Sequence, residues 1–111
     1  MLYVLQKMAG LPKALPEGWF ESDSEEASVR YAELQRELPP GHILYRKGVS
    51  VVAHREGTDD ILCRHHDDPS QFTVIHLSWL GREEINSMHP TVEADGDFDE
   101  FLNYESAFGR A

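Results

Sequence analysis

The chain has 111 residues, of which 41% are hydrophobic and 27% charged. This composition is typical of one globular domain with a real core and excludes the disordered class. The 20 acidic and 10 basic side chains give a formal net charge of −10, which disfavours nucleic acids and anionic membrane surfaces as partners.

The start of the chain has a short apolar patch but no basic leader, and no run approaches the roughly 20 apolar residues that span a bilayer. We therefore expect no signal peptide and a cytoplasmic protein. The single cysteine, Cys63, agrees with a reducing compartment and excludes an internal disulfide. Residues 1–10 are predicted to be a disordered extension, with Met8 as an alternative start, and residues 11–111 to form one domain.

The first predicted elements are an extended segment and a helix. Residues 11–20 hold two prolines and a glycine, which suit neither a helix nor a central strand, and Trp19 is expected to anchor this segment in the core. A helix is predicted over residues 23–38, where Ser22 and Glu25 have the form of a capping box. Helical spacing places an inward-facing stripe at Ala27, Tyr31, Leu34 and Leu38. The side chains expected to face outward are Glu33, Arg36 and Glu37.

Extended segments follow the helix. Residues 42–45 suit a short edge strand, and residues 49–54, 60–66 and 71–79 suit a three-stranded antiparallel meander. The last of these is rich in β-branched and aromatic residues, so we expect it to be buried on much of both faces.

A register follows if residues 67–70 form a four-residue loop. Cys63 then lies opposite Val74, and Ile61 lies opposite His76. One face of this hairpin is then expected to carry Ile61, Cys63, His65, Phe72, Val74 and His76. The other face is expected to carry Leu62, Arg64, Thr73, Ile75, Leu77 and Trp79. A slip of one residue would exchange the faces.

The C-terminal part completes the predicted fold. Residues 83–90 show no clean period and are expected to be loop, with residues 91–94 as a fourth short strand. Asp97 and Glu100 form a second capping box, and the helix that they begin has phenylalanines at 98, 101 and 108 that imply docking on the core. The predicted fold class is α+β, an antiparallel meander of three to four strands packed with an N-terminal and a C-terminal helix.

Several residues that could carry chemistry are interpreted as structural. Adjacent strand residues point to opposite faces, so His65 and His66 are not expected to share a metal ion. Asp68 precedes a proline and suits a turn. Cys63 is expected to be a packed, inert thiol because its predicted neighbours are apolar. Neither a metal site nor a cofactor site is predicted.

Residues 74–79, followed by Gly81 and Glu83-Glu84, resemble a group of small uncharacterised bacterial proteins. The shared pattern is a run of apolar residues, His-Leu-Ser/Thr-Trp, a glycine and a glutamate, with Thr-Asp-Asp-Ile-Leu upstream, here Thr58 to Leu62. The resemblance covers residues 34–101 and implies no particular activity. In type only, small acidic proteins of this kind resemble immunity proteins encoded beside secreted toxins.

These observations favour an acidic protein-binding module rather than an enzyme, in concrete form an immunity-type inhibitor of a basic toxin or a similar basic partner. The expected contacts are acidic side chains at turns and helix starts, namely Asp67, Asp68, Glu93, Asp95, Asp97 and Asp99. One alternative is a small enzyme or ligand-binding protein with a pocket around His76, Trp79 and Glu83. Another is a homodimer with a structural role that buries one face of the sheet.

Overall fold

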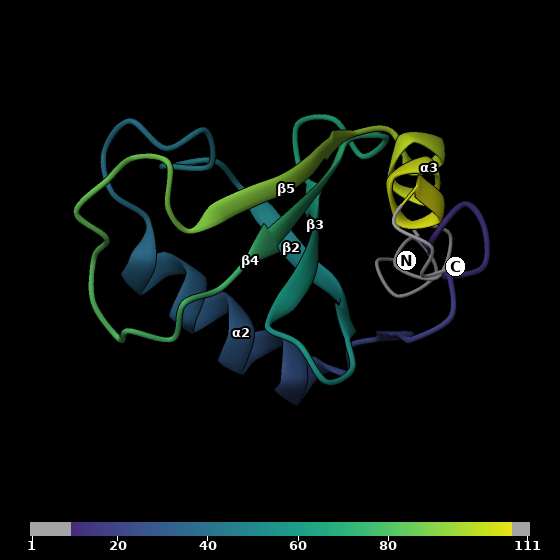
Figure 1. Ribbon diagram of the computed structural model, residues 1–111, viewed down its shortest axis with the longest axis horizontal. Helices are drawn as coiled ribbons and strands as arrows, with labels where there is room; N and C mark the ends of the chain where they lie inside the picture. Colours follow the sequence, from purple (N-terminus) through teal and green to yellow (C-terminus); the bar gives the residue numbers. More distant parts are fainter. Residues whose placement is uncertain (1–9, 108–111) are drawn as a thin grey trace, which may run out of the picture.

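Five antiparallel strands lie side by side in sequence order in the computed structural model of the protein, which describes residues 10–107 (Figure 1). They are β1 (Trp19–Glu21), β2 (Val49–Arg55), β3 (Asp60–His65), β4 (Phe72–His76) and β5 (Thr91–Gly96). Two helices accompany them, α2 (Ser24–Glu37) and α3 (Phe98–Ala107). The α+β class is confirmed, and the sheet has more strands than the three to four predicted because Trp19–Glu21 pairs with β2.

The predictions made for the two ends of the chain lie outside the described residues, apart from Gly10. These are the extension before residue 10, the start at Met8, and the end of the last helix at Phe108 and Gly109. Within residues 10–107, no helix has the length and apolar character needed to cross a membrane.

Helix α2 and its N-cap each begin one residue later than predicted. Asp23, not Ser22, is the N-cap, and Asp23 and Glu26 form the capping box. The Asp23 carboxylate accepts the Glu26 amide at 2.8 Å, and the Glu26 carboxylate accepts the Asp23 amide at 2.9 Å. A carboxylate at this position satisfies helix N–H groups and also lies at the positive end of the helix dipole.

The predicted orientation of α2 is wrong at its C-terminal half. Leu34 and Leu38 are buried as expected, but Tyr31 is exposed. Glu33 and Glu37 were expected to face outward, and they are only 2% and 0% exposed. The reason is that a later segment of the chain covers this side of the helix, as described below.

Residues 42–45 form turns and not the predicted edge strand. The His42 ring fixes them, because its Nδ1 accepts the Leu44 amide at 3.0 Å and its Nε2 lies 2.7 Å from the Pro90 carbonyl oxygen. The turn thereby places Leu44 in the core, where it is completely buried.

The predicted register between β3 and β4 is wrong by one residue. Cys63 lies opposite Thr73 and Ile61 opposite Ile75, while Asp60 lies opposite His76. The connection is longer than the four residues assumed, because the His65 amide already pairs with the Gln71 carbonyl at 3.1 Å. The slip exchanges the faces of all β4 residues relative to β3.

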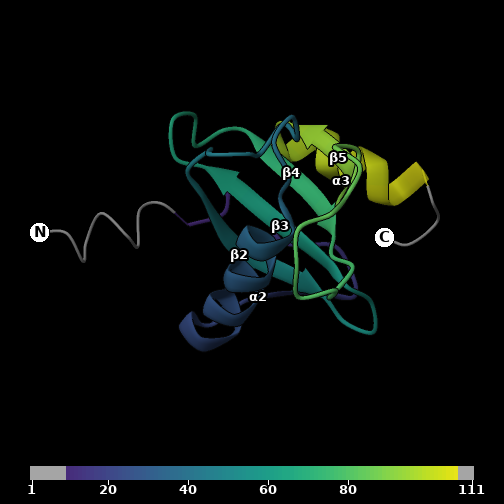
Figure 2. The same cartoon turned by 90° about the vertical axis from the view of Figure 1, so that its left-hand side faces the viewer.

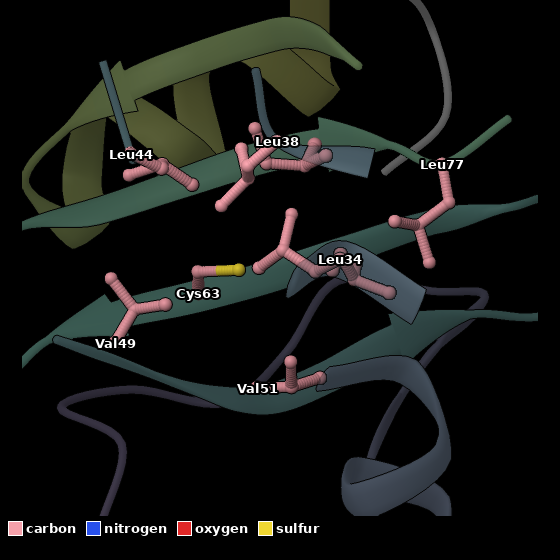
Figure 3. Close-up of a cluster of buried hydrophobic side chains, with 9 residues drawn as sticks. Leu34, Leu38, Leu44, Val49, Val51, Cys63 and Leu77 are labelled. Carbon is pink, nitrogen blue, oxygen red and sulfur yellow. The ribbon is translucent and has the colours of Figure 1, made fainter. Parts of the chain in front are cut away.

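With this register, each face of the sheet has its own core. Over the α2 face pack Leu34, Leu38, Leu44, Val49, Val51, Ile61, Cys63, Ile75 and Leu77, most of which Figure 3 labels. Over the α3 face pack Trp19, Ala53, Leu62, Phe72, Val74, Phe98 and Phe101. The expected role of Trp19 as a core anchor is confirmed, and its ring meets that of Phe101 edge to face at 5.1 Å. The two helices therefore lie on opposite sides of the sheet (Figure 2).

Strand β5 is an edge of the sheet and carries a bulge. Val74 pairs with Ala94 and Ile75 with Val92, so Glu93 is the additional residue. Tyr104 of α3 donates a hydrogen bond to Glu93 at 2.9 Å, and Thr73 donates one to Asp95 at 2.6 Å. Bulges and charged side chains are the usual protection of an exposed sheet edge against pairing with another chain.

We expect Phe101→Ala to lower the free energy of unfolding by about 3–5 kcal/mol, because it leaves a cavity between α3 and the sheet. Phe20→Ala provides the matched control, since Phe20 is exposed on β1, and should change stability by about 1 kcal/mol or less. Urea unfolding followed by circular dichroism measures both. Equal effects of the two substitutions would contradict the described core.

Candidate functional site

The loop of residues 77–90, between β4 and β5, exposes an unusual amount of apolar surface. Among the described residues, four of the large exposed hydrophobic side chains belong to this loop: Trp79, Leu80, Ile85 and Met88. Ile85 is 94% exposed and Trp79 41%. Figure 1 shows the loop in green at the end of the molecule opposite α3, beside the turns that follow α2. Grouped apolar side chains on a surface mark interaction sites more often than scattered ones do.

The start of this loop is bound to the last turns of α2 through buried carboxylates. Glu37 accepts the Ser78 amide at 3.0 Å with one oxygen and the Trp79 amide at 2.6 Å with the other. Glu33 accepts the Gly81 amide at 2.9 Å. These three hydrogen bonds fix the backbone from residue 78 to residue 81.

The fixed backbone has an uncommon conformation. Trp79 has a φ of 58° and Gly81 a φ of 73°. The left-handed region is open to glycine but is rarely adopted by a bulky side chain, and it persists only when the surroundings impose it. The Glu33 and Glu37 contacts supply that constraint, and the result is an indole held on the surface at a defined position.

The two glutamates also interact with each other. They lie one helical turn apart on α2, and Arg36 donates two hydrogen bonds to Glu33, at 2.7 and 3.1 Å. The hydrogen bond from Glu37 is the main cause that lowers the pKa of Glu33. Burial, followed by the hydrogen bond to Glu33, raises the pKa of Glu37 to about 7. These opposite shifts are typical of two carboxyl groups too close together to ionise independently.

A shallow hollow of about 280 Å³ lies where the end of the loop meets the turns after α2. Its lining is mostly apolar and is formed by Gly41, His42, Ile43, Ser87, Met88, Thr91 and Val92. Gly41 has a φ of 95°, and a Cβ there would lie 3.3 Å from the Cβ of Ser87. The close approach at Gly41 allows the loop to pack against the turns and leaves Ile43 and Met88 exposed around the hollow.

The acidic residues predicted as contacts have structural partners for the most part. Asp68 accepts the Ser70 amide and hydroxyl, and these hydrogen bonds lower its pKa. Asp97 accepts the Glu100 amide at 2.8 Å as the predicted capping box requires. Glu93 and Asp95 hold β5, as described above, and Asp67 is exposed in the turn.

The fold brings two of these acidic regions together. Ser70 of the β3–β4 turn lines one hollow of about 200 Å³ with Asp97 and Asp99 at the start of α3. Asp99 forms an exposed ion pair with Lys13, at 2.6 Å, at the same place. The β3–β4 turn and the start of α3 therefore lie close together, at the end of the molecule away from loop 77–90 (Figure 1).

Of the three residues of the alternative pocket, His76 is the last residue of β4, and Trp79 and Glu83 belong to loop 77–90. His76 is half exposed, and its Nδ1 lies 2.8 Å from the Asp60 carboxylate. That hydrogen bond raises the pKa of His76 above its usual value of 6.5.

Cys63 is completely buried opposite Val51 and Thr73, and burial raises the pKa of its thiol to about 12. A thiol that stays protonated at neutral pH is a poor nucleophile. Within residues 10–107 there is no cluster of three or more His, Cys, Asp or Glu residues able to hold a metal ion.

No family model, curated protein or solved structure matches this chain. Sequence reasoning missed Glu33 and Glu37 as important residues. The available signal was weak: two glutamates four residues apart, each followed by an inward-facing leucine, Leu34 or Leu38. Helical spacing alone places such glutamates at the border of the buried stripe.

We expect Glu37→Ala to destabilise the protein by roughly 2–4 kcal/mol, because an unsatisfied buried donor costs on the order of 1–3 kcal/mol and two amides lose their acceptor. Gln35→Ala is the control, since Gln35 is exposed on the same helix. Urea unfolding gives the stabilities, and amide hydrogen exchange at Ser78 and Trp79 reports on the loop. Unchanged exchange at both amides in Glu37→Ala would contradict this account.

A second prediction concerns His76. Because its pKa is raised in the fold, the contact with Asp60 stabilises the protein fully below the unfolded pKa, and this contribution disappears as the pH rises through the folded pKa. Asp60→Asn should therefore shift the His76 titration to lower pH. Titration of the ring protons by NMR measures the shift, and an unchanged His76 titration would contradict the contact.

Proposed function

We propose that the protein is an acidic protein-binding module that contacts its partner through loop 77–90. The observation that carries this proposal is the exposed indole of Trp79 on a backbone fixed by Glu37. Tryptophan is enriched among the residues that dominate binding energy at interfaces. A side chain whose backbone is already ordered loses less entropy when a partner binds.

The rest of the loop suits the surroundings of such an anchor. Leu80, Ile85 and Met88 provide further exposed apolar area, and Ile43 adds to it across the hollow. Methionine and leucine side chains adapt to irregular surfaces and exclude water around a central contact. We infer that the partner presents an apolar depression that accepts the indole.

The charge of the chain supports a basic partner. A net charge of −10 accelerates encounter with a positively charged protein and repels acidic ones. In this proposal the acidic side around Asp67, Asp97 and Asp99 acts mainly through this long-range attraction, while the loop makes the close contact. An immunity-type inhibitor that covers a basic toxin is the concrete form that we favour.

The direct test is binding to the product of the neighbouring gene, measured by calorimetry with the full chain. Trp79→Ala should weaken binding at least tenfold, about 1.4 kcal/mol or more, and should leave the unfolding midpoint nearly unchanged. Val29→Ala is the matched control, because Val29 is exposed on α2, outside the loop, and should bind as the unmodified chain does.

Salt separates the two contributions. Raising the ionic strength should slow association by screening the acidic side, and Trp79→Ala should mainly speed dissociation. Normal binding by Trp79→Ala would disprove the role of the loop. Self-association of the chain in sedimentation, abolished by the same substitution, would identify a second copy as the occupant and would also contradict the proposal of a basic partner.

A further inference from the structure

We propose that the hollow between the first half of α2 and the start of β2 binds a small uncharged ring that carries hydroxyl groups. This α2–β2 hollow has a volume of about 380 Å³, which is in the range of small-molecule sites. It is lined by Ser24, Ala27, Ser28, Tyr31, Val49, Ser50, Val51 and His66. Loop 77–90 is bound to the last turns of the same helix, so the two surfaces are separate.

The α2–β2 hollow exists because short side chains line the first half of the helix. Helix α2 packs over β2 (Figure 2). In its second half, Leu34 and Leu38 fill the space above the sheet and are buried. In its first half, Ser24, Ala27 and Ser28 are too short to do so. Larger apolar side chains would have filled this space and buried more area, so the fold leaves room here for another molecule.

Hydroxyl groups stand on the helix side of the α2–β2 hollow and can be reached from solvent. Ser24, Ser28 and Tyr31 are all exposed. Within residues 10–107 their hydroxyl groups have no hydrogen-bond partner. Each therefore has both a donor and acceptor positions available to a ligand.

On the sheet side, Ser50 and His66 form a polar pair that is held in place. The Ser50 hydroxyl lies 2.8 Å from Nε2 of His66. The His66 amide donates to the Gly48 carbonyl at 2.9 Å, and a Cβ at Gly48 would lie 2.9 Å from Nδ1 of the ring. The glycine thus leaves the room that the ring occupies, and the ring in turn positions the Ser50 hydroxyl.

The chemistry of these groups favours hydroxyl groups on the ligand. A hydroxyl both donates and accepts a hydrogen bond, so it can pair with the hydroxyl of Ser28, Tyr31 or Ser50 in either direction. This holds whichever ring nitrogen of His66 carries the proton. A carboxylate can only accept and an ammonium can only donate, so either would use half of what the lining offers.

The charge of the surroundings favours a neutral ligand. The lining of the α2–β2 hollow contains no acidic residue, lysine or arginine that could pair with an ion. An anion would also meet the carboxylates of Asp23, Glu25 and Glu26 at the start of α2.

The rest of the lining is apolar and suits the faces of a ring. Ala27, Val49 and Val51 supply aliphatic surface, and Tyr31 supplies an aromatic one. Sites of this kind combine a mainly apolar lining with a few polar groups that fix the orientation of the ligand. A sugar ring and a phenolic ring share the required chemistry, apolar faces with hydroxyl groups along the edge.

The test is a titration of the full chain with two uncharged probes, methyl glucoside for a sugar and resorcinol for a phenol, followed by amide NMR. At least one probe should shift the amides of Ser28, Tyr31, Ser50 and His66 together, with a Kd on the order of 1–10 mM. The anionic counterparts, glucuronate and 3-hydroxybenzoate, should bind more weakly than the probes that they resemble.

Ser28→Leu tests the hollow itself, because the longer side chain would occupy it. This variant should lose the shared shifts and should unfold at the same or a higher temperature, since leucine favours the helix and buries apolar area. Val29→Leu is the matched control. Val29 is exposed on α2 and does not line the hollow, so this variant should bind as the unmodified chain does.

The proposal is overturned if neither uncharged probe shifts these amides, if the anionic counterparts bind as tightly, or if Ser28→Leu binds normally. Should Ser28→Leu fail to fold, Tyr31→Ala removes one wall of the hollow at an exposed position and should weaken binding by about tenfold or more. None of these measurements involves Trp79 or a protein partner, so a negative result leaves the proposed function intact.

Discussion

Burial of the middle strands on both faces is the constraint on which the rest of this structure depends. Neighbouring residues of β3, Ile61 and Leu62, point to opposite sides and are both almost completely buried, as are Val74 and Ile75 of β4. A sheet with two apolar faces needs a cover on each side. Helix α2 supplies one cover and α3 the other (Figure 2).

The position of loop 77–90 follows from this arrangement. After β4 the chain leaves the sheet beside the C-terminal half of α2, and Leu77 enters the core below that helix. The next residues cross the helix surface, where their amides need acceptors once water is displaced. Glu33 and Glu37 provide these acceptors. The same contacts that satisfy the backbone therefore also fix the backbone of Trp79, whose exposed indole is the anchor in the proposed function.

The sequence predicted the positions of most helices and strands, but predicted the strand register and the contacts between distant segments less well. Strong local signals placed α2, α3 and the strands β2 to β5, because period, caps and proline positions are local properties. The strand β1 was predicted only as part of an extended segment, residues 42–45 were wrongly predicted as a strand, and β4 ends at His76 and not at Trp79. The predicted β3–β4 register was wrong because the turn contains one residue more than assumed, and a shift of one residue exchanges the faces of the strand. The amino-acid composition of a turn does not determine its length reliably. Glu33 and Glu37 were predicted to be exposed because helical spacing cannot show that a segment more than 40 residues later lies over them. The conformation of Trp79 depends on those same distant contacts and was not predictable either.

The bulge in β5 has a consequence for how this protein meets other molecules. A regular, uncharged edge strand would allow a strand of another molecule to pair with it through main-chain hydrogen bonds. Such pairing depends little on the side chains of the added strand. The bulge at Glu93 interrupts the regular spacing of this strand, and Glu93 and Asp95 place carboxylates along it. Continuous growth of the sheet from one molecule to the next is thereby discouraged at this border. Any contact that another molecule makes along β5 must then be made with side chains rather than with a regular main-chain ladder, while β1 remains the other edge of the sheet.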